Sequence, residues 1–264
     1  MLRGLIGVVH LLPLPGDPGC ATPDFAPAYA RAKADAEALV AGGVDGLIVE
    51  NFGSAPFAKG CEGDRVPAHQ AAALTRVCLM CKGLDVPVGV NCLRNDAITA
   101  LGIAAACGLD FVRVNVHCGA YVTDQGLIEG EAAASLRYRQ ALGVADSVAI
   151  AADVLVKHAA PLAPLEPEVA TRDCVLRGMA DAVIVTGTGT GQPVDPELLE
   201  RVRGAAEGRP VLIGSGLNPD SADALMSLAD GAIVGSWLKV DGRVHNPVDR
   251  ARVSAMVEAC KHAG

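Results

Sequence analysis

The sequence of 264 residues predicts an α/β fold, a single (β/α)8 or TIM barrel that occupies residues 1–264 as one domain. Three observations support this prediction. Short runs rich in β-branched residues recur at fairly even spacing, and Ala-rich stretches with helical periodicity lie between them. The runs are apolar almost throughout, which is typical of parallel strands buried on both faces. Eight such units in about 250 residues match the usual size of this barrel.

The expected strands are residues 4–10, 46–51, 87–93, 111–117, 148–158, 182–187, 210–216 and 231–237. Three of the helices between and after them have clear start signals, because Asp195, Asn218 and Asn246 are capping residues that each precede a proline. An open, doubly wound sheet is the alternative. The dinucleotide-binding pattern G-x-G-x-x-G, however, does not follow the first strand.

The first five expected strands end in polar or charged side chains. In chain order these are His10; Glu50 and Asn51; Asn91, with Arg94 beyond it; Arg113, Asn115 and His117; and Asp153 and Lys157. Arg113, Asn115 and His117 alternate along one strand, so we expect them to share a side of it. The chemistry of this fold lies at the carboxyl ends of the strands, and buried charges need partners or a function. These residues therefore predict a substrate site at one rim of the barrel.

The last three strands end in glycine-rich loops. The sixth leads into Thr186–Gly191, "TGTGTG", where Gly187, Thr190 and Gly191 are expected to contact a ligand, although a plain strand-to-helix connection is the alternative. It is not a Walker A loop, because no Gly-Lys-Ser/Thr follows. The seventh ends in Gly214-Ser215-Gly216 and the eighth in Gly235-Ser236. Such barrels often bind phosphate between these two loops, and a capped helix after Asn218 would assist.

Several roles are open for the charged rim residues. Lys157 is a candidate imine-forming nucleophile, general acid or base, or cation for a substrate anion, and a salt bridge to Asp153 or Glu50 is the alternative. Glu50 and Asp153 are candidate acid/base groups. They are also possible ligands of a divalent cation, Mg²⁺ or Mn²⁺, with Asn91 or Asn115. No HxH or carboxylate triad occurs at a diagnostic spacing, so no dedicated metal site is predicted.

Composition excludes several classes of partner. The net charge of -8 and the aromatic content of 3% disfavour nucleic acid. No apolar run approaches the ~18 residues of a transmembrane segment. Nine cysteines without framework spacing indicate reduced thiols and a cytoplasmic protein. The Ala-rich outer helices permit a homo-oligomer. Residues 117–130, which follow the fourth strand, are expected to form a long functional loop.

Eight segments of the chain resemble the BtpA/SgcQ family in the family's own order. They are "GVVHLLPLPGDPG", "GVDGLIVENFGSAPF", "VPVGVNCLRNDA", "FVRVNVHCGAYVTDQGLIEG", "DVLVKHA", "AVIVTGTGTGQP", "VLIGSGLNPDSA" and "DGAIVGSWLKVDGRVHNPVD". The resemblance implies a ribulose-phosphate-binding TIM barrel. It places His10, Glu50, Asn51, Asn91, Arg94, Asn115, Asp153 and Lys157 on the family's recurring polar positions, with phosphate loops at 214–216 and 235–236. Cys92 and Cys118 depart from the family pattern, which has Val and Thr there.

Two functions follow as hypotheses. The first is an isomerase- or lyase-like enzyme that acts on a small phosphorylated sugar- or nucleotide-derived metabolite, as the sugar-phosphate gene context of the SgcQ branch implies. The second is a non-catalytic biogenesis or stability factor for a membrane complex, because another branch of the family is named for photosystem I biogenesis. The charged rim favours the enzyme, since a scaffold gains nothing from buried charges.

Overall fold

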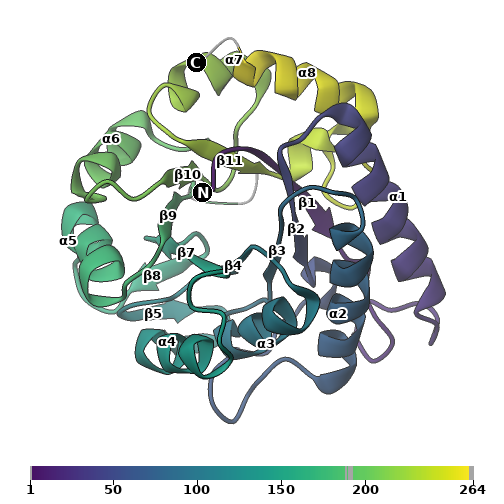
Figure 1. The fold of residues 1–264 in the computed structure, drawn as a ribbon, viewed down its shortest axis with the longest axis horizontal. Helices are drawn as coiled ribbons and strands as arrows, with labels where there is room; N and C mark the ends of the chain where they lie inside the picture. The colour runs from purple at the N-terminus through teal and green to yellow at the C-terminus, as the bar shows by residue number, and fades with distance from the viewer. Residues whose placement is uncertain (1, 188, 190–192, 262–264) are drawn as a thin grey trace.

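The computed structural model of the chain describes residues 2–187, 189 and 193–261. Eight parallel strands close into a barrel in the order β1-β11-β10-β9-β7-β4-β3-β2. The barrel strands are β1 (Gly4–His10), β2 (Gly46–Glu50), β3 (Val88–Asn91), β4 (Phe111–Val114), β7 (Ala149–Val154), β9 (Ala182–Val185), β10 (Val211–Ile213) and β11 (Gly231–Val234). Each lies within one expected strand, and in Figure 1 the helices form a ring around them. The predicted TIM barrel is confirmed.

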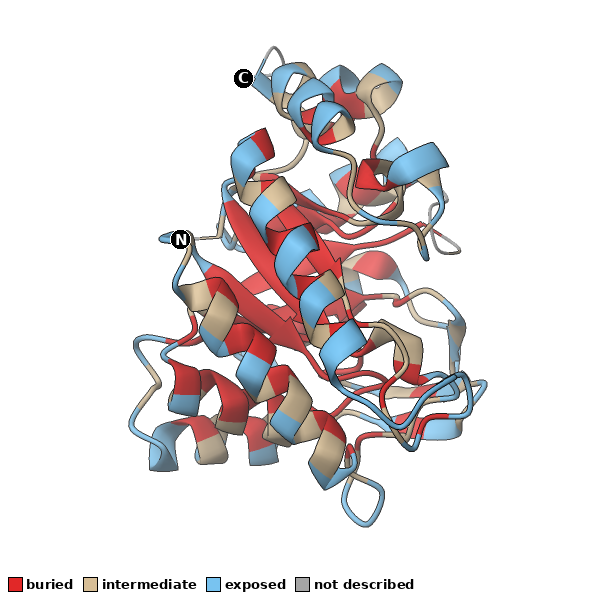
Figure 2. Cartoon of the chain, turned by 90° about the vertical axis from the view of Figure 1, so that its right-hand side faces the viewer, coloured by how far each residue is buried: buried red, intermediate tan, exposed pale blue. Residues whose placement is uncertain are grey.

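The helices pack one face on the barrel and leave the other exposed. They are α1 (Ala26–Gly42), α2 (Ala68–Lys82), α3 (Ala97–Cys107), α4 (Ala132–Ala141), α5 (Pro167–Arg172), α6 (Pro196–Ala205), α7 (Pro219–Met226) and α8 (Arg250–Lys261). In Figure 2 the barrel strands are almost entirely red, whereas the helices alternate between buried and exposed residues. Both faces of the parallel sheet are therefore covered, as the uninterrupted apolar runs require.

The inside of the barrel changes from apolar to polar along the strands. A separate cluster that includes Ile6, Ile48, Phe111, Ile184 and Leu212 fills the half near the strand starts. Because inward-facing residues alternate along a strand, the next inward positions toward the carboxyl ends are polar. In the sheet register His10 lies beside Glu50, and Glu50 lies beside Asn91. The apolar cluster thus forms a closed floor beneath a polar upper layer.

The barrel closes where β1 pairs with β11, with Gly4 opposite Gly231. Behind this seam, the buried Lys239 Nζ donates a hydrogen bond to Asp35 Oδ2 of α1 at 2.8 Å. The Val248 amide donates to the other oxygen of the same carboxylate at 2.8 Å. The first and last units of the chain are therefore joined by backbone pairing and by a buried ion pair.

Residues 117–130 differ from the expected loop. They form a hairpin of β5 (Ala120–Thr123) and β6 (Gly126–Glu129), and β8 (Ala159–Pro161) adds to β5 as a third antiparallel strand. The partner that orders this segment comes from beyond Lys157, about forty residues later in the chain, so local pattern could not reveal it.

The last helix also begins later than expected. α8 starts at Arg250 rather than after Asn246, because Asp249 Oδ1 accepts the Ala251 amide at 2.9 Å and acts as the cap. Asn246 instead uses its side-chain amide to bond the Val240 carbonyl at 2.9 Å.

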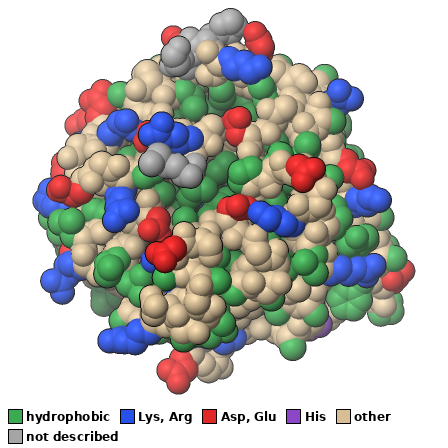
Figure 3. Space-filling view, viewed as in Figure 1, with side chains coloured by type: hydrophobic (Ala, Val, Ile, Leu, Met, Phe, Trp, Pro, Cys, Tyr) green, Lys and Arg blue, Asp and Glu red, His purple; other side chains and the backbone are tan. Residues whose placement is uncertain are grey.

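Charges of both signs are mixed on the molecular surface. Figure 3 shows a face on which acidic and basic side chains are interspersed, without a continuous basic patch. Within the residues that the structure describes, no helix combines the length and apolar character needed to cross a bilayer.

Candidate functional site

A cavity of about 230 Å³ opens at the carboxyl ends of the barrel strands. Most of the residues expected at the rim line it: His10, Glu50, Asn91, Arg94, Arg113, Asn115, Lys157, Gly214, Ser215, Gly216, Gly235 and Ser236. The cavity is small, since pockets for drug-sized ligands measure about 300–1,000 Å³.

Asp153 organises the base of this cavity from β7. Its two oxygens accept hydrogen bonds from Arg113 Nε and Nη2, each at 3.0 Å, and Asn115 Nδ2 adds a third bond at 2.8 Å. The Asp153 side chain is 0% exposed and does not line the cavity. Burial opposes the charge of Arg113, but Asp153 and then Glu50 outweigh it and raise the pKa of the guanidinium. Asp153 therefore holds Arg113 and Asn115 in place.

Glu50 reaches the cavity from the end of β2. Its Oε1 lies 3.5 Å from Arg113 Nη1 and accepts a hydrogen bond from Asn91 Nδ2 at 3.3 Å. His10 Nε2 lies 3.7 Å from Glu50 Oε2. Burial, then Lys239 and Lys157, lower the pKa of His10 well below 6.5, so the ring is neutral at pH 7 and this contact is not an ion pair. Glu50 is thus a carboxylate with one charged partner and access to the cavity.

Lys157 lies just beyond the end of β7, and its backbone is fixed on two sides. Arg94 Nη2 donates to the Lys157 carbonyl at 2.7 Å, and the Lys157 amide donates to Thr186 Oγ1 at 3.2 Å. Burial, then the charge of Arg113, lower the pKa of the amine from 10.5 to about 8, although Glu50 and Asp153 oppose the shift. A substantial fraction of Lys157 is therefore uncharged slightly above neutral pH.

The two glycine-serine loops form the opposite wall. An added Cβ at Gly235 would lie 2.7 Å from His10 Cε1, so only glycine lets the loop approach the histidine this closely. Asn218 caps α7, accepting the Ser221 amide at 3.0 Å, and it lines the cavity. The Gly187 amide donates to Ser215 Oγ at 3.1 Å, which ties the sixth strand's loop to the seventh's. Two glycine-serine loops and the start of α7 therefore border this side of the cavity, and anion sites use elements of this type.

Some expected site residues lie elsewhere. Asn51 is buried and bonds Gln70 Oε1 and both backbone groups of Leu93, so it supports the wall without lining the cavity. The structure does not bring His117 beside Arg113 and Asn115, because β4 ends at Val114 and His117 Nε2 lies 2.8 Å from the Gly178 carbonyl oxygen. Thr190 and Gly191 lie outside the described residues.

Three aromatic residues at the cavity were not predicted. Phe52 and Phe57 come from the loop between β2 and α2, and Trp237 follows β11. They carry no sequence signal of their own, since aromatic residues in loops usually mark only local packing. The positions of Phe52 and Phe57 depend on how the loop 52–67 folds back over the rim.

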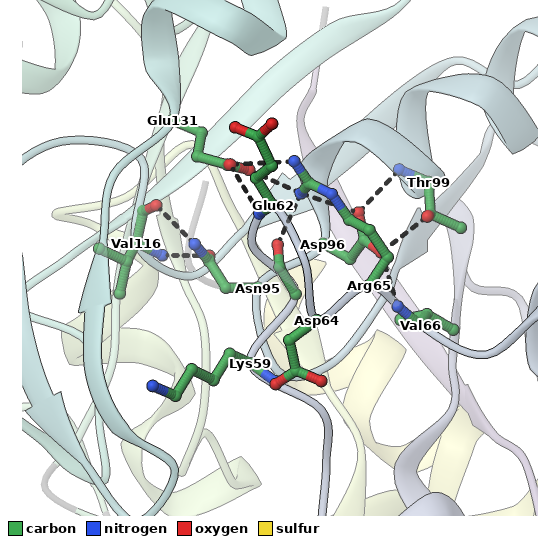
Figure 4. Close-up of polar contacts among 11 residues, drawn as sticks. Lys59, Glu62, Asp64, Arg65, Val66, Asn95, Asp96, Thr99, Val116 and Glu131 are labelled. Carbon is green, nitrogen blue, oxygen red and sulfur yellow. Dashed lines mark hydrogen bonds and ion pairs between the residues drawn. The ribbon is translucent and has the colours of Figure 1, made fainter.

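Arg65 fastens this loop to two other loops (Figure 4). Its Nη1 and Nη2 donate to the two carboxylate oxygens of Glu131 at 2.6 and 2.9 Å, and Nη1 also contacts Asp96 Oδ1 at 3.3 Å and the Gly60 carbonyl at 2.8 Å. Asp96 in turn caps α3 through the Thr99 amide at 2.9 Å and accepts the Val66 amide at 2.8 Å. We call Arg65, Asp96 and Glu131 the loop clasp.

The carboxylates that a metal ion would need are already paired with a positive charge. Glu50, which lines the cavity, and Asp153, which lies beneath it, both face Arg113. Among residues 2–187, 189 and 193–261 no cluster of three or more His, Cys, Asp or Glu side chains is arranged to hold a metal ion. A divalent cation at Glu50 would have to compete with the guanidinium.

Fold and site together define a single TIM barrel with a small, charged cavity at the carboxyl ends of its strands. The chain belongs to the BtpA family, whose sequence profile matches residues 1–262. It is 48% identical to the photosystem I biogenesis protein BtpA of Synechocystis over 97% of this chain and 87% of that protein. It is 43% identical to an uncharacterized protein of Pyrococcus furiosus, over 97% of this chain and 94% of the other.

Solved structures share the fold at low identity. A tryptophan synthase structure from Mycobacterium tuberculosis superposes with a TM-score of 0.64 at 20% identity, covering 98% of this chain and 92% of the other. Thiamine phosphate pyrophosphorylase from Pyrococcus furiosus gives a TM-score of 0.58 at 13% identity, covering 99% and 96%. Phosphoribosyl anthranilate isomerase from Thermus thermophilus gives 0.55 at 11% identity, covering 99% and 100%.

Proposed function

We propose that this protein is a cytoplasmic enzyme that binds a small phosphorylated sugar- or nucleotide-derived metabolite and moves a proton next to its carbonyl group, as isomerases and lyases do. One observation carries the proposal. Glu50, Arg113 and Lys157 line the same cavity of about 230 Å³ as the two glycine-serine loops, which supports acid/base groups and a phosphate-binding side within one site.

Each lining residue has a role in this proposal. Glu50 transfers the proton, since it is the carboxylate that lines the cavity. Asp153 acts as a positioning residue, because its carboxylate accepts hydrogen bonds from Arg113 and Asn115 and does not line the cavity. Asn91, Asn115, Arg94 and Arg113 orient the substrate. The Gly214 amide donates to the Val185 carbonyl, so the amides of residues 215–216 and 235–236 hold its phosphate, and Lys157 stabilises the developing oxyanion or forms an imine.

Two structural neighbours support a phosphorylated ligand by their names, thiamine phosphate pyrophosphorylase and phosphoribosyl anthranilate isomerase. Those names describe other proteins at 13% and 11% identity, so the argument rests first on the cavity itself.

The test is thermal unfolding with a panel of sugar and nucleotide phosphates, with inorganic phosphate as the control and each condition run with and without Mg²⁺ or Mn²⁺. A ligand at ~100 times its dissociation constant stabilises by about 2.7 kcal/mol and should raise the midpoint by several degrees. Trp237, the only tryptophan of the chain, lines the cavity and reports binding by fluorescence.

Variants sharpen this test. We expect Lys157→Ala to lose much of the ester-specific shift, and Lys33→Ala, on the outer face of α1, to keep it. If no phosphate ester shifts the midpoint beyond inorganic phosphate, with or without metal, the proposed function is wrong.

The second candidate is a biogenesis or stability factor for a membrane complex, which the name of the Synechocystis relative favours. The discriminating experiment expresses this chain in that cyanobacterium lacking its relative and measures photosystem I. A factor that works as a scaffold would restore photosystem I equally well as the wild type and as Glu50→Gln. An enzyme supplying a needed metabolite would lose that activity with Glu50→Gln.

A further inference from the structure

Among the described residues, Lys157 and Arg94 are the cavity cations that Glu50 and Asp153 do not pair. Glu50 and Asp153 both direct their oxygens to Arg113, at 3.5 and 3.0 Å. In the part of the chain that the structure describes, no carboxylate forms an ion pair with Lys157 Nζ, so the salt bridge that was the alternative role of this lysine is not observed. Its backbone, by contrast, is held by Arg94 and Thr186, so the amine is presented from a fixed point.

The cavity does not need Lys157 as a permanent positive charge. Arg113 and Arg94 already line it, and guanidinium groups stay protonated throughout the range of pH in which enzymes work. Arg113 is already paired with Glu50 and Asp153, but Arg94 can hold an oxyanion or a phosphate without Lys157. A buried lysine beside other cations is instead the usual setting of a lysine nucleophile, because crowding disfavours the ammonium form.

A second observation concerns the ligand. Asn115 is buried and lines the cavity, and its Nδ2 is used by Asp153, whereas its Oδ1 has no hydrogen-bond partner. A buried acceptor in a ligand cavity requires a donor, and a hydroxyl group supplies one. A ligand with a hydroxyl group near Asn115 and an anionic end at the glycine-serine loops would fit both sides of the cavity.

We propose that Lys157 forms an imine with the carbonyl carbon of a small phosphorylated hydroxyaldehyde or hydroxyketone. This proposal rests on the proposed function and chooses between the two roles left open there for Lys157. The phosphate lies at residues 215–216 and 235–236, a substrate hydroxyl donates to Asn115 Oδ1, and Glu50 is the proton-transfer group.

The step balances without an oxidant or a cofactor. The neutral amine of Lys157 attacks the carbonyl carbon, and the C=O π electrons move to oxygen, which takes up a proton. The resulting carbinolamine loses that oxygen as water and becomes a protonated imine. Glu50 then accepts the proton from the neighbouring carbon, and the electrons of that C–H bond flow into the imine to give an enamine. An isomerase or a lyase can both continue from the enamine.

The first experiment traps the imine. The wild type is incubated with D-ribose 5-phosphate, dihydroxyacetone phosphate or D-glyceraldehyde 3-phosphate and with sodium cyanoborohydride, which reduces an imine to a stable secondary amine. Peptide mass spectrometry then locates the adduct. We expect the adduct at Lys157. For the ester that fits the cavity, the adduct yield should be at least tenfold above that of the unphosphorylated sugar. Excess inorganic phosphate should suppress it. Lys157→Arg should abolish it, and Lys33→Arg should not.

The second experiment needs no substrate. Competitive labelling with acetic anhydride at several pH values, read by mass spectrometry, measures the nucleophilicity of each lysine. Labelling of Lys157 should reach half its maximum near pH 8, where its amine loses its proton, and should precede that of the exposed Lys33.

The outcomes separate this proposal from the proposed function. Esters that raise the unfolding midpoint but leave no adduct on Lys157, together with slow acetylation of this residue, would overturn the imine and leave a phosphate-ester enzyme with an electrostatic lysine. If no ester binds and none is trapped, both proposals fail.

Discussion

The amine of Lys157 illustrates how a single residue in this cavity opposes folding. Its pKa falls from 10.5 to about 8, first through burial and then through Arg113. Below pH 8 the lysine is charged in both the folded and the unfolded chain, and the folded chain carries the full penalty. Between about pH 8 and 10.5 the unfolded chain binds more protons, so the free energy of unfolding rises with pH and the penalty disappears.

We therefore expect Lys157→Met to stabilise the protein at pH 7, by about 3 kcal/mol at most, since one unit of pKa corresponds to about 1.4 kcal/mol. The gain should shrink as the pH rises from 8 toward 10.5. Denaturant unfolding of both proteins at pH 7 and pH 9.5 measures it. A variant less stable than the wild type at pH 7 would show that the ammonium group makes favourable contacts.

A second residue-scale prediction concerns Cys118. The Cys174 thiol donates a hydrogen bond that lowers the pKa of Cys118, although burial opposes the shift. Burial raises the pKa of the Cys78, Cys92 and Cys107 thiols. Because the thiolate is the reactive form, iodoacetamide at pH 8 should alkylate Cys118 roughly tenfold faster than these three. Peptide mass spectrometry over time measures the alkylation rates, and Cys174→Ala should slow the alkylation of Cys118. Equal rates would contradict the assignment.

At the scale of elements, the loop 52–67 forms one wall of the site. It contributes Phe52 and Phe57 to the cavity, and its Ala58 carbonyl accepts the Arg94 amide at 3.1 Å. The loop clasp fixes its far end through charge-assisted bonds of 2.6 and 2.9 Å between Arg65 and Glu131. The wall and the orientation of Arg94 therefore depend on a contact with the segment just before α4.

Arg65→Met should lower the free energy of unfolding by roughly 1–3 kcal/mol, because it removes the positively charged partner of Glu131 and of the buried Asp96. Arg177→Met is the matched control. Its ion pair to Asp173 spans 3.9 Å with 83% of the Arg177 side chain exposed, so its loss should cost well under about 1 kcal/mol.

The same pair of variants tests the link to the site. Hydrogen exchange of residues 57–66 should accelerate in Arg65→Met alone, and any phosphate ester that binds the wild type should bind this variant more weakly. If the loop exchanges at the wild-type rate without Arg65, the clasp does not hold the wall.

Over the whole molecule, the sequence was sufficient to predict the barrel and most of the side chains in the polar upper layer. Every second residue of a barrel strand faces inward, so the inward face of β1 runs from Ile6 and Val8 to His10. The same alternation places Glu50 above Ile48 in β2. Local sequence therefore determines which side chains enter the barrel. His117 breaks this rule because the strand ends at Val114, and strand length depends on neighbours that the local pattern does not contain. The clasp joins residues 65 and 131, and only the folded chain brings such distant partners together.

The closure of the barrel also makes a prediction about cooperativity. β1 and β11 come from opposite ends of the chain, and their pairing places Gly4 against Gly231. A Cβ at Gly231 would lie 2.5 Å from the Gly4 carbonyl oxygen and 2.8 Å from its nitrogen. These are backbone atoms of the paired strand, so the seam can accept the methyl group only by moving apart.

We expect Gly231→Ala to lower the free energy of unfolding by roughly 1–3 kcal/mol. Gly204→Ala is the control, because nothing lies within 4 Å of an added Cβ on this exposed residue of α6, and alanine should stabilise the helix by up to about 1 kcal/mol.

Circular dichroism and Trp237 fluorescence can be followed together during denaturant unfolding. The free energy of unfolding derived from each signal should fall by the same amount in Gly231→Ala. A closed barrel cannot open at one seam while keeping the remaining strands paired in the same register, so secondary structure and the surroundings of Trp237 should be lost in one transition. If only the fluorescence midpoint moved, the strand pair β1–β11 would be a local contact that the rest of the barrel does not require, and the polar layer spanning His10 and Glu50 could form without closure.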